Sequence, residues 1–431
     1  MPLPGVRRHS NKAEIANSPD LCAAGKTGAA LTVDAARLRA MAAVQPMRQS
    51  EPLPLEAALG RVLSESPTAK SNLPPFDNSA MDGYAIRRSD LSGPGPFQLR
   101  VTDRIAAGDR RLICLYPCTA AQIFTGGPLP EGADAVIMQE RVRRSKNIIT
   151  FDELPHAGQN IRRSGEDRRR GDPTLQHGLL LTPTRLALLA GTGVEEVVVC
   201  RKLMVGLFST GNELCELGTE LEPGQIYNSN RVMLRAMLAE PWVHVTDYGI
   251  LPDHPGRIRS TIRQAATQND VVVSSGGVSA GEEDHILDAL SRENAALEVL
   301  KVAIRPGKPL TIGRVGNALF FGLPGNPYAA AITFSQIARP ALRKAAGITE
   351  SSDFWIPAVS GFEYIRSSGR REFVPVTWDS RDVLGRPVLQ RLGKGASASL
   401  GPIAIAHGIA VIEPDVTHIV PGMPIAVEPL I

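Results

Sequence analysis

The chain lacks several features that would assign it to a class at once. Its 431 residues include only five cysteines (Cys22, Cys114, Cys118, Cys200 and Cys215), and no two of them have C-x-x-C spacing. We therefore expect no disulfide framework and no structural zinc site, and we predict a reducing, cytoplasmic location. No apolar run approaches the ~20 residues of a membrane span, and no signal-peptide core follows the N-terminal arginines. A net charge of +3 is too small for a dedicated nucleic-acid binder.

Large aromatic side chains are also scarce, at 5% of the residues, whereas glycine (40) and proline (34) exceed their usual share. This composition indicates many turns and few bulky core side chains. Dividing the length by about 150 residues per domain predicts roughly three domains. Most of the 47 basic residues are arginine, a bias that GC-rich coding DNA also produces.

The hydrophobic pattern changes along the chain. A helical period is predicted from 31 to about 63, in which Leu55, Leu59 and Val62 continue the spacing. From about 76 to 172, short β runs are separated by glycine and proline turns. From about 201 to 348, apolar strands alternate with helices, which predicts a parallel, doubly wound sheet. The remainder, from about 352, is typical of a small β-barrel or sandwich.

Polar residues follow the predicted strands of the α/β segment. In an open α/β sheet, ligands bind beyond the carboxyl ends of the strands, so these residues are expected to share one site. Glycines at such an edge let backbone N–H groups approach an oxyanion, arginine and lysine add charged donors, and carboxylates hold a divalent cation. The residues concerned are Gly276, Gly277, Arg305, Lys308, Glu213, Asp253 and Asp284.

Simpler interpretations exist for each of these features taken alone. Gly276-Gly277 after a strand is most often a tight turn, and it is the coincidence of five polar strand ends that favours a site for an anionic, phosphate-bearing ligand. Neither G-x-G-x-x-G nor a Walker A motif occurs, so the usual dinucleotide and P-loop sites are not indicated. In the β-rich segment, Asp82 and Asp167 lie in clusters that would individually be turns or capping residues.

Eight motifs carry a family resemblance when they are taken together in their order along the chain. The chain resembles the MoeA / gephyrin E-domain family, the molybdopterin molybdenumtransferases of molybdenum cofactor synthesis, over about 32–431. Each motif alone is weak, but eight in register are specific. They are PPFDNSAMDGYA, TGGPLPEGADAVIMQE, GQNIRRSGED, LFSTGNEL, GQIYNSN, SSGGVSAGEED, RPGKPL and GLPGNP.

The mixed, aperiodic composition of the first residues predicts a flexible leader (1–31). The resemblance implies a multidomain α/β plus β fold in four parts after it, the first of which is an elongated helical domain in two segments (32–70 and 173–200). A β-rich domain (71–172) is inserted between them, and a doubly wound α/β molybdopterin-binding domain (201–350) and a C-terminal β-barrel (351–431) follow. The family is dimeric, and its cleft is shared between the α/β domain of one subunit and the β-rich domain of the other.

The resemblance also implies the reaction and the residues that perform it. Adenylated molybdopterin and molybdate give molybdenum cofactor and AMP, with Mg²⁺ or another divalent cation assisting. Asp284, Glu213 and Asp253 are implied as metal-binding and catalytic, and Asp82 as catalytic. The implied substrate-binding residues are Thr125, Asp167, Ser275, Gly276, Gly277, Lys301, Arg305, Lys308, Pro324, Pro327, Ser397 (or Ser399) and Arg371 (or Arg370).

Two departures from the family pattern concern the oxyanion site. GLPGNP is commonly followed by Val-Ser but here by Tyr328-Ala329, which removes a hydroxyl, and Arg305 stands where a lysine is common. Two alternatives to the transferase remain: a non-catalytic, gephyrin-like scaffold that binds partner peptides, and the equivalent enzyme for tungstate. The grouped acids favour catalysis over scaffolding.

Overall fold

A six-stranded mixed sheet forms the centre of the largest module. The computed structural model describes residues 30–276, 296–307, 309–350 and 354–430. The strand order is β14-β11-β15-β19-β18-β16, and the first four strands are parallel. The bounds of the six strands are β11 (Leu203–Thr210), β14 (Val243–Leu251), β15 (Val271–Ser275), β16 (Ala296–Leu300), β18 (Leu310–Val315) and β19 (Ala318–Leu323).

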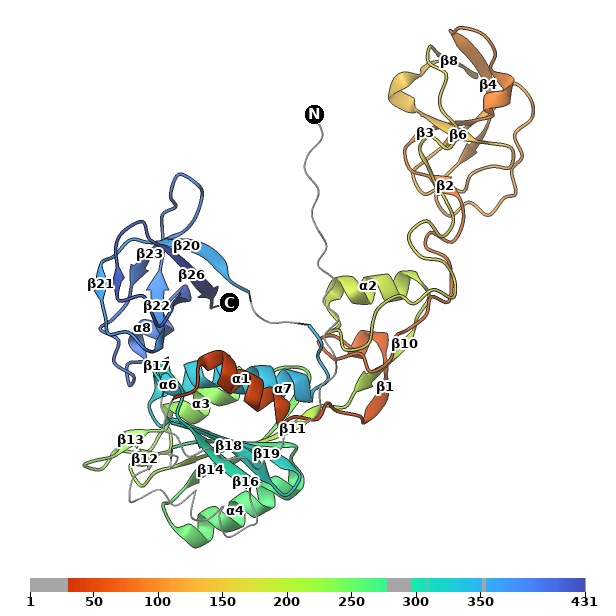
Figure 1. Cartoon of the computed structure of the whole chain (residues 1–431). Coiled ribbons are helices and arrows are strands. Elements are labelled where there is room, and N and C mark those ends of the chain that lie inside the picture. The colour runs from red at the N-terminus through yellow and green to blue at the C-terminus, as the bar shows by residue number, and fades with distance from the viewer. Residues whose placement is uncertain (1–29, 277–295, 308, 351–353, 431) are drawn as a thin grey trace, which may run out of the picture.

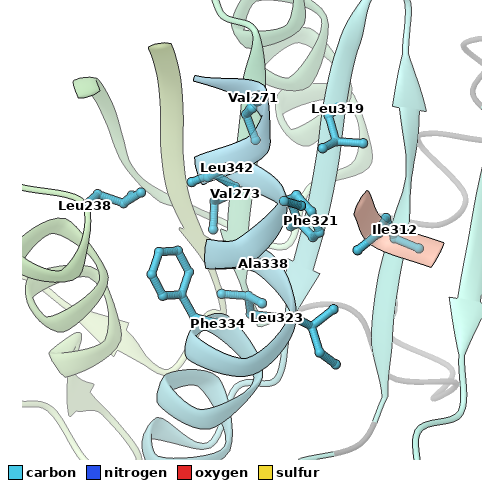
Figure 2. Packing of buried hydrophobic residues seen from close by; sticks show 14 of the residues in the cluster. Leu238, Val271, Val273, Ile312, Leu319, Phe321, Leu323, Phe334, Ala338 and Leu342 are labelled. Atoms are coloured by element: carbon cyan, nitrogen blue, oxygen red, sulfur yellow. The ribbon is translucent and has the colours of Figure 1, made fainter. Parts of the chain in front are cut away.

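Helices cover both faces of this sheet. On one face α4 packs against Phe208, Val272 and Phe320, and the larger core lies on the other face (Figures 1 and 2). Strand residues alternate between the two cores, so β15 sends Val271 and Val273 to one and Val272 to the other. The helices are α1 (Val33–Ala42), α3 (Ser229–Met237), α4 (Pro255–Gln268), α6 (Pro327–Thr333) and α7 (Arg339–Ala345), with a π-helical segment η4 (Phe334–Ala338) between the last two.

The prediction of a parallel sheet is wrong for its last two strands. β18 and β19 are antiparallel because only Gly316 and Asn317 join them, and a parallel pair needs a long crossover. β16 is antiparallel to β18 as well. The apolar run over 297–304 divides between two sheets, because β16 ends at Leu300 and β17 (Ile304–Arg305) joins a different sheet.

A narrow middle segment connects this module to the β-rich one. β1 (Ser50–Pro54) pairs with β10 (Glu196–Cys200), and α2 (Pro183–Gly191) packs beside them. The helix predicted through Leu55, Leu59 and Val62 does not form, since only one 3₁₀ turn, η1 (Leu55–Ala57), follows β1. Gly60 then takes a φ of +69°, which a right-handed helix does not allow. The first part of the predicted helical period forms α1, which packs against η4 and α7 of the six-stranded module.

The β-rich module lies at the far end of the molecule from the six-stranded sheet (Figure 1). Its main sheet has the order β6-β3-β5-β4-β8-β7, and β2 pairs separately with β9. The bounds are β2 (Asn78–Ser79), β3 (Gly83–Ile86), β4 (Phe97–Ile105), β5 (Thr119–Ile123), β6 (Ala135–Met138), β7 (Arg143–Ser145), β8 (Ile148–Phe151) and β9 (Ile161–Arg162), with 3₁₀ turns η2 (Arg88–Asp90) and η3 (Gln139–Arg141).

The C-terminal part is a closed barrel of five strands. β22 (Arg371–Thr377) pairs with both β23 and β24, which closes the ring β22-β23-β20-β26-β24, and β17 adds to β22 at its edge. The remaining elements are β20 (Ile356–Ser360), β21 (Tyr364–Ile365), β23 (Val388–Arg391), α8 (Gly401–Ala404), β24 (Gly408–Ile412), β25 (His418–Ile419) and β26 (Pro424–Pro429). The predicted combination of an α/β domain, a β-rich insertion and a barrel is thus confirmed. No helix in the described ranges is both long and apolar enough to cross a membrane.

Removal of a core ring should destabilise the six-stranded module. Phe321, on β19, is fully buried among Val273, Phe334 and their neighbours (Figure 2). We expect Phe321→Ala to lower the free energy of unfolding of this module by about 3–5 kcal/mol, measured by denaturant titration. The matched control is Phe354→Ala, because the Phe354 ring is 62% exposed and its loss should leave the unfolding midpoint unchanged. Equal midpoints for the two variants would contradict the packing described.

Candidate active site

A cleft of about 930 Å³ opens at the carboxyl ends of the parallel strands, between the six-stranded module and the barrel. One wall comes from the segments after β11, β14, β15 and β19 and from the start of α3. The other wall comes from the chain around β17 and from two barrel loops. The residues that matter below are Thr210, Gly211, Glu213, Asn228, Asn230, Asp253, Gly276, Arg305, Pro324, Asn326, Pro327, Ala329, Arg370 and Ser397.

Two of the predicted metal-binding acids, Glu213 and Asp253, line this cleft. A reciprocal pair of hydrogen bonds ties their loops together. The Asn212 N–H donates to Asp253 Oδ2 at 3.0 Å, and the Asp253 N–H donates to Asn212 Oδ1 at 3.1 Å. Gly211 has a φ of +149°, and a Cβ there would lie 2.4 Å from the Glu213 carboxylate. Glycine at 211 therefore lets the Glu213 side chain fold back over its own loop.

The glycine turn after β15 has a tighter structural role than the sequence predicts. Gly276 has a φ of +87°, and a Cβ there would lie 2.5 Å from the Thr210 carbonyl oxygen. Its N–H donates to the Leu323 carbonyl at 3.2 Å, so this backbone donor is already used and is not presented to an anion. Ser275 does not line the cleft, because its buried Oγ lies 3.0 Å from Ser209 Oγ behind the wall.

The predicted basic residues separate in the structure. Arg305 lines the cleft, whereas Lys301 is exposed outside it, and its carbonyl accepts a hydrogen bond from the Leu31 N–H at 2.7 Å. Arg371 also lies outside the lining, since its guanidinium pairs with Asp34 and Glu413 at 2.9 and 3.1 Å. Its neighbour Arg370 lines the cleft instead. Consecutive residues at the start of a strand point to opposite sides, which separates the two arginines.

Pro324 and Pro327 shape the loop that brings the barrel into the site. Asn326, between them, donates from Nδ2 to Ser397 Oγ at 2.9 Å, and the Tyr328 N–H donates to the Ser397 carbonyl at 3.1 Å. Ser397 is thereby held at the cleft beside Ala329, where the common family serine is missing. Burial raises the pKa of the Tyr328 phenol, and its hydroxyl donates to the Phe373 carbonyl of β22 at 2.5 Å.

Three predicted residues, Asp82, Thr125 and Asp167, belong to the distant β-rich module and not to this cleft. Asp82 and Thr125 do meet each other. Asp82 Oδ1 accepts hydrogen bonds from the Thr125 backbone N–H and from Thr125 Oγ1, both at 2.8 Å. These two hydrogen bonds hold the pKa of Asp82 below its usual value. The Asp167 carboxylate forms an ion pair with its neighbour, with Oδ1 3.8 Å from Arg168 Nη1. Asp284, Gly277 and Lys308 fall outside the described residues.

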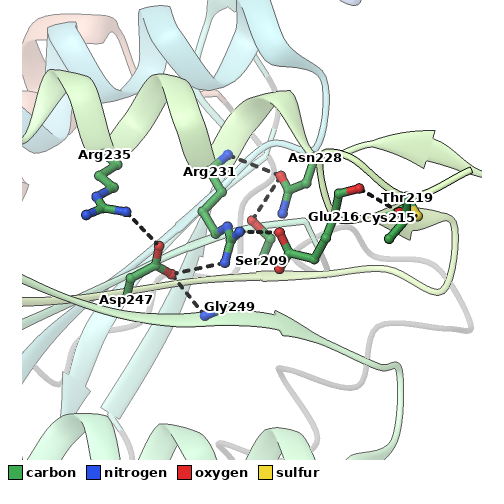
Figure 3. A network of polar contacts seen from close by, with 9 residues as sticks. All are labelled: Ser209, Cys215, Glu216, Thr219, Asn228, Arg231, Arg235, Asp247 and Gly249. Carbon is green, nitrogen blue, oxygen red and sulfur yellow. Dashed lines mark hydrogen bonds and ion pairs between the residues drawn. The ribbon is translucent and has the colours of Figure 1, made fainter.

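A polar network beside the cleft was not identified from the sequence (Figure 3). Asn228 is the N-cap of α3, where its Oδ1 accepts from the Arg231 N–H at 3.1 Å. Arg231 pairs with Glu216 and, at 3.4 Å, with Asp247, and so fixes the loop of β12 (Leu214–Cys215) and β13 (Ile226–Tyr227) against β14. Asn230 Nδ2 donates to the Gly325 carbonyl at 2.7 Å. Asn228 and Asn230 belong to the motif GQIYNSN, which enters the sequence analysis only as one of the eight motifs of the resemblance.

Three family models match successive parts of the chain. The MoeA N-terminal region (domains I and II) matches residues 31–193. The probable molybdopterin-binding domain matches 206–344, which contains most of the acidic wall of the cleft, and the MoeA C-terminal region (domain IV) matches 357–430.

Curated relatives decide the family. The molybdopterin molybdenumtransferase of Haemophilus influenzae is 43% identical over 318 residues, which cover 74% of this chain and 78% of the relative. The chain belongs to the MoeA family of molybdopterin molybdenumtransferases. Molybdopterin molybdenumtransferase 2 of Mycobacterium tuberculosis is 35% identical, with 87% and 94% of the two chains covered. The crystal structure of the molybdopterin biosynthesis MoeA protein of Pyrococcus horikoshii OT3 has a TM-score of 0.79 at 27% identity and covers 93% of this chain and 100% of that one.

The donor set of this MoeA-family cleft is compatible with a hard divalent cation. Glu213 and Asp253 supply carboxylate oxygens, the ligands that Mg²⁺ prefers, and both line the same cavity. Across the ranges that the structure describes, no cluster of three or more potential metal ligands is formed. Two protein carboxylates are nevertheless sufficient for Mg²⁺ when it also binds a phosphate-bearing substrate.

The Asp82–Thr125 contact predicts a measurable titration. In Thr125→Val one of the two hydrogen bonds is lost, so the pKa of Asp82 should rise toward its usual 3.8. Because the folded-state pKa is depressed, the contact stabilises the fold above the unfolded pKa, and this contribution is lost as the pH falls through the folded pKa. The pKa is measured by NMR titration of the carboxyl carbon. Thr150→Val, on β8 of the same module, is the control, and an unchanged Asp82 pKa in Thr125→Val would refute the assignment.

Proposed function

We propose that the cleft binds adenylated molybdopterin, inserts molybdate and releases AMP. The observation that carries this proposal is the division of one cleft, in a MoeA-family chain, into a carboxylate wall and a cationic wall. Glu213 and Asp253 lie on the first, and Arg305 and Arg370 on the second. A ligand that carries phosphate together with a bound cation, and reacts with an oxyanion, meets complementary charges on both walls.

The reaction has two steps, hydrolysis of the adenylate and insertion of molybdenum. Water adds to the adenylate phosphorus, the phosphoanhydride P–O bond breaks, and AMP leaves the phosphate of molybdopterin. The dithiolene thiols then bind molybdenum, and one oxygen of molybdate leaves as water with the two thiol protons. The chain's part in both steps is to hold the reacting groups in place and to balance their charge.

The carboxylates are proposed to hold the divalent cation, with Mg²⁺ as the first candidate. Glu213 and Asp253 would bind it together with Asp284, which the sequence places after the Gly276-Gly277 turn. The bound cation would neutralise charge on the phosphate oxygens. The hydrogen bonds between Asn212 and Asp253 fix the distance between the two loops, so the acids are oriented before the ligand arrives.

The remaining predicted residues are proposed to come from a second copy of the chain. Asp82, Thr125 and Asp167 lie in a module that does not contribute to the cleft of its own chain. A homodimer that places the β-rich module of one subunit at the cleft of the other would make these residues functional. The predicted cytoplasmic location agrees with such an enzyme of cofactor synthesis.

Neutralising the cleft acids should abolish most of the AMP release. We expect Glu213→Gln and Asp253→Asn each to slow it by about 10- to 100-fold in the presence of Mg²⁺, with the fold retained. Asp284→Asn should have an effect at least as large. Released AMP is measured by chromatography after incubation with adenylated molybdopterin. The control is Glu298→Gln, since Glu298, among the described residues, forms only an exposed ion pair with Arg39. Wild-type rates in the cleft variants would refute the proposal.

Mixed dimers test the shared cleft. Asp82→Asn and Glu213→Gln should each release AMP slowly when alone, because every cleft carries one defect. When the two are mixed and allowed to exchange subunits, about one quarter of the clefts should be intact, and AMP release should recover in proportion. Glu213→Gln mixed with Asp253→Asn is the control, because both residues belong to the same wall and no intact cleft arises. No recovery in the first mixture, or a fully active monomer in sedimentation, would contradict the model.

A further inference from the structure

A buried carboxylate of the barrel faces the arginine of the cleft. β17 pairs with β22 in parallel, and the register places Arg305 opposite Glu372. Arg305 Nε lies 3.4 Å from Glu372 Oε1, and the Glu372 side chain is only 3% exposed, against 35% for Arg305. Nε is the closest atom of the guanidinium, so the two terminal nitrogens lie further from the carboxylate. The ion pair thus connects the interior of the barrel to the surface of the cleft.

Glu372 is itself held on two further sides. Arg366 Nε lies 2.9 Å from Glu372 Oε2, and the Arg366 side chain is 1% exposed. The Tyr364 hydroxyl donates to Glu372 Oε1 at 2.9 Å, and the guanidinium of Arg391 stacks 3.9 Å from the centre of the Tyr364 ring. The group therefore contains one carboxylate and three arginines, and Arg305 is the member of the group that lines the cleft. Burying such a group is costly and does not in general stabilise a fold.

We propose that Glu372 is a positioning residue for Arg305. The negative charge of Glu372 holds the Nε edge of the guanidinium toward the barrel, and the terminal N–H groups are left to bind a tetrahedral oxyanion in the cleft. This inference rests on the proposed function, because the oxyanion is either molybdate or the phosphate of the adenylated substrate.

The geometry also explains why arginine suits position 305. A lysine presents a single nitrogen, which an adjacent buried carboxylate would draw away from the ligand. An arginine separates the two tasks, because Nε can face the carboxylate while the terminal nitrogens bind an anion in a fixed plane.

The test compares Glu372→Gln with Glu363→Gln in the full chain. Glu363 is an exposed barrel residue that pairs only with His418 among the described residues. AMP release is measured with molybdate and adenylated molybdopterin varied in turn. We expect Glu372→Gln to raise the half-saturating concentration of one of them by about tenfold, with a maximal rate near that of the wild type. Molybdate is identified as the oxyanion if its value rises, and the substrate phosphate if the other rises. Unchanged half-saturation, or a loss confined to the maximal rate, would overturn the proposal.

Coupling to Arg305 separates positioning from a purely structural role. Glu372→Gln is introduced into the wild type and into Arg305→Lys. If Glu372 acts through Arg305, its effect on half-saturation should be several-fold smaller in the second background. Equal effects in both backgrounds would refute the proposal.

Two further measurements cover the remaining outcomes. Glu372→Gln removes the negative charge beside the buried Arg366, so the folding of the variant is checked by circular dichroism. Should it not fold, Tyr364→Phe takes its place, because it removes one hydrogen bond from Glu372 and should shift half-saturation in the same direction by a smaller factor. If the wild type releases no AMP, the proposed function fails. Calorimetric titration of molybdate and of inorganic phosphate into the same variants then measures the coupling as a change in Kd, and equal values in all variants would refute the positioning role.

Discussion

The cleft depends on one constraint, which is that three parallel strands of the six-stranded sheet, β11, β15 and β19, are buried on both faces. β11, β15 and β19 supply side chains alternately to the core under α4 and to the core under α6 and α7. Polar groups therefore have almost no place along these strands and gather where the strands end. Since parallel strands end at one edge, Glu213, Asp253, Gly276 and Pro324 meet there, although they are far apart in the chain.

A second, smaller pairing completes the site. After β16 the chain leaves the sheet and forms β17, whose two residues pair with β22 of the barrel. This crossing carries Arg305 to the cleft, and the loop at Asn326 binds Ser397 from the barrel side. The charges of the two walls thus arise from different folding units. The acids belong to the α/β edge, and the cationic groups belong to the joint with the barrel.

Local patterns predicted the alternation of apolar strands and helices in the α/β module. They also predicted that Glu213, Asp253 and Gly276 would share an edge, because that follows from parallel topology alone. Pairing choices could not be predicted in the same way. The direction of β18, the transfer of β17 and the outward side chain of Arg371 depend on which strand each residue meets. The use of the Gly276 N–H by Leu323 is likewise a tertiary contact that no local pattern encodes.

The two departures from the family pattern lie close together in the structure, beside β22 of the barrel. Arg305, where a lysine is common, lies opposite Glu372, and Tyr328, where a valine is common, donates its hydroxyl to the Phe373 carbonyl. Glu372 and Phe373 are consecutive residues of β22, so Arg305 and Tyr328 contact the same strand of the barrel. On the same wall as Ala329, Asn326 donates a hydrogen bond to the hydroxyl of Ser397. Both departures thus lie at the joint between barrel and cleft, and the acidic wall formed by Glu213 and Asp253 is separate from it.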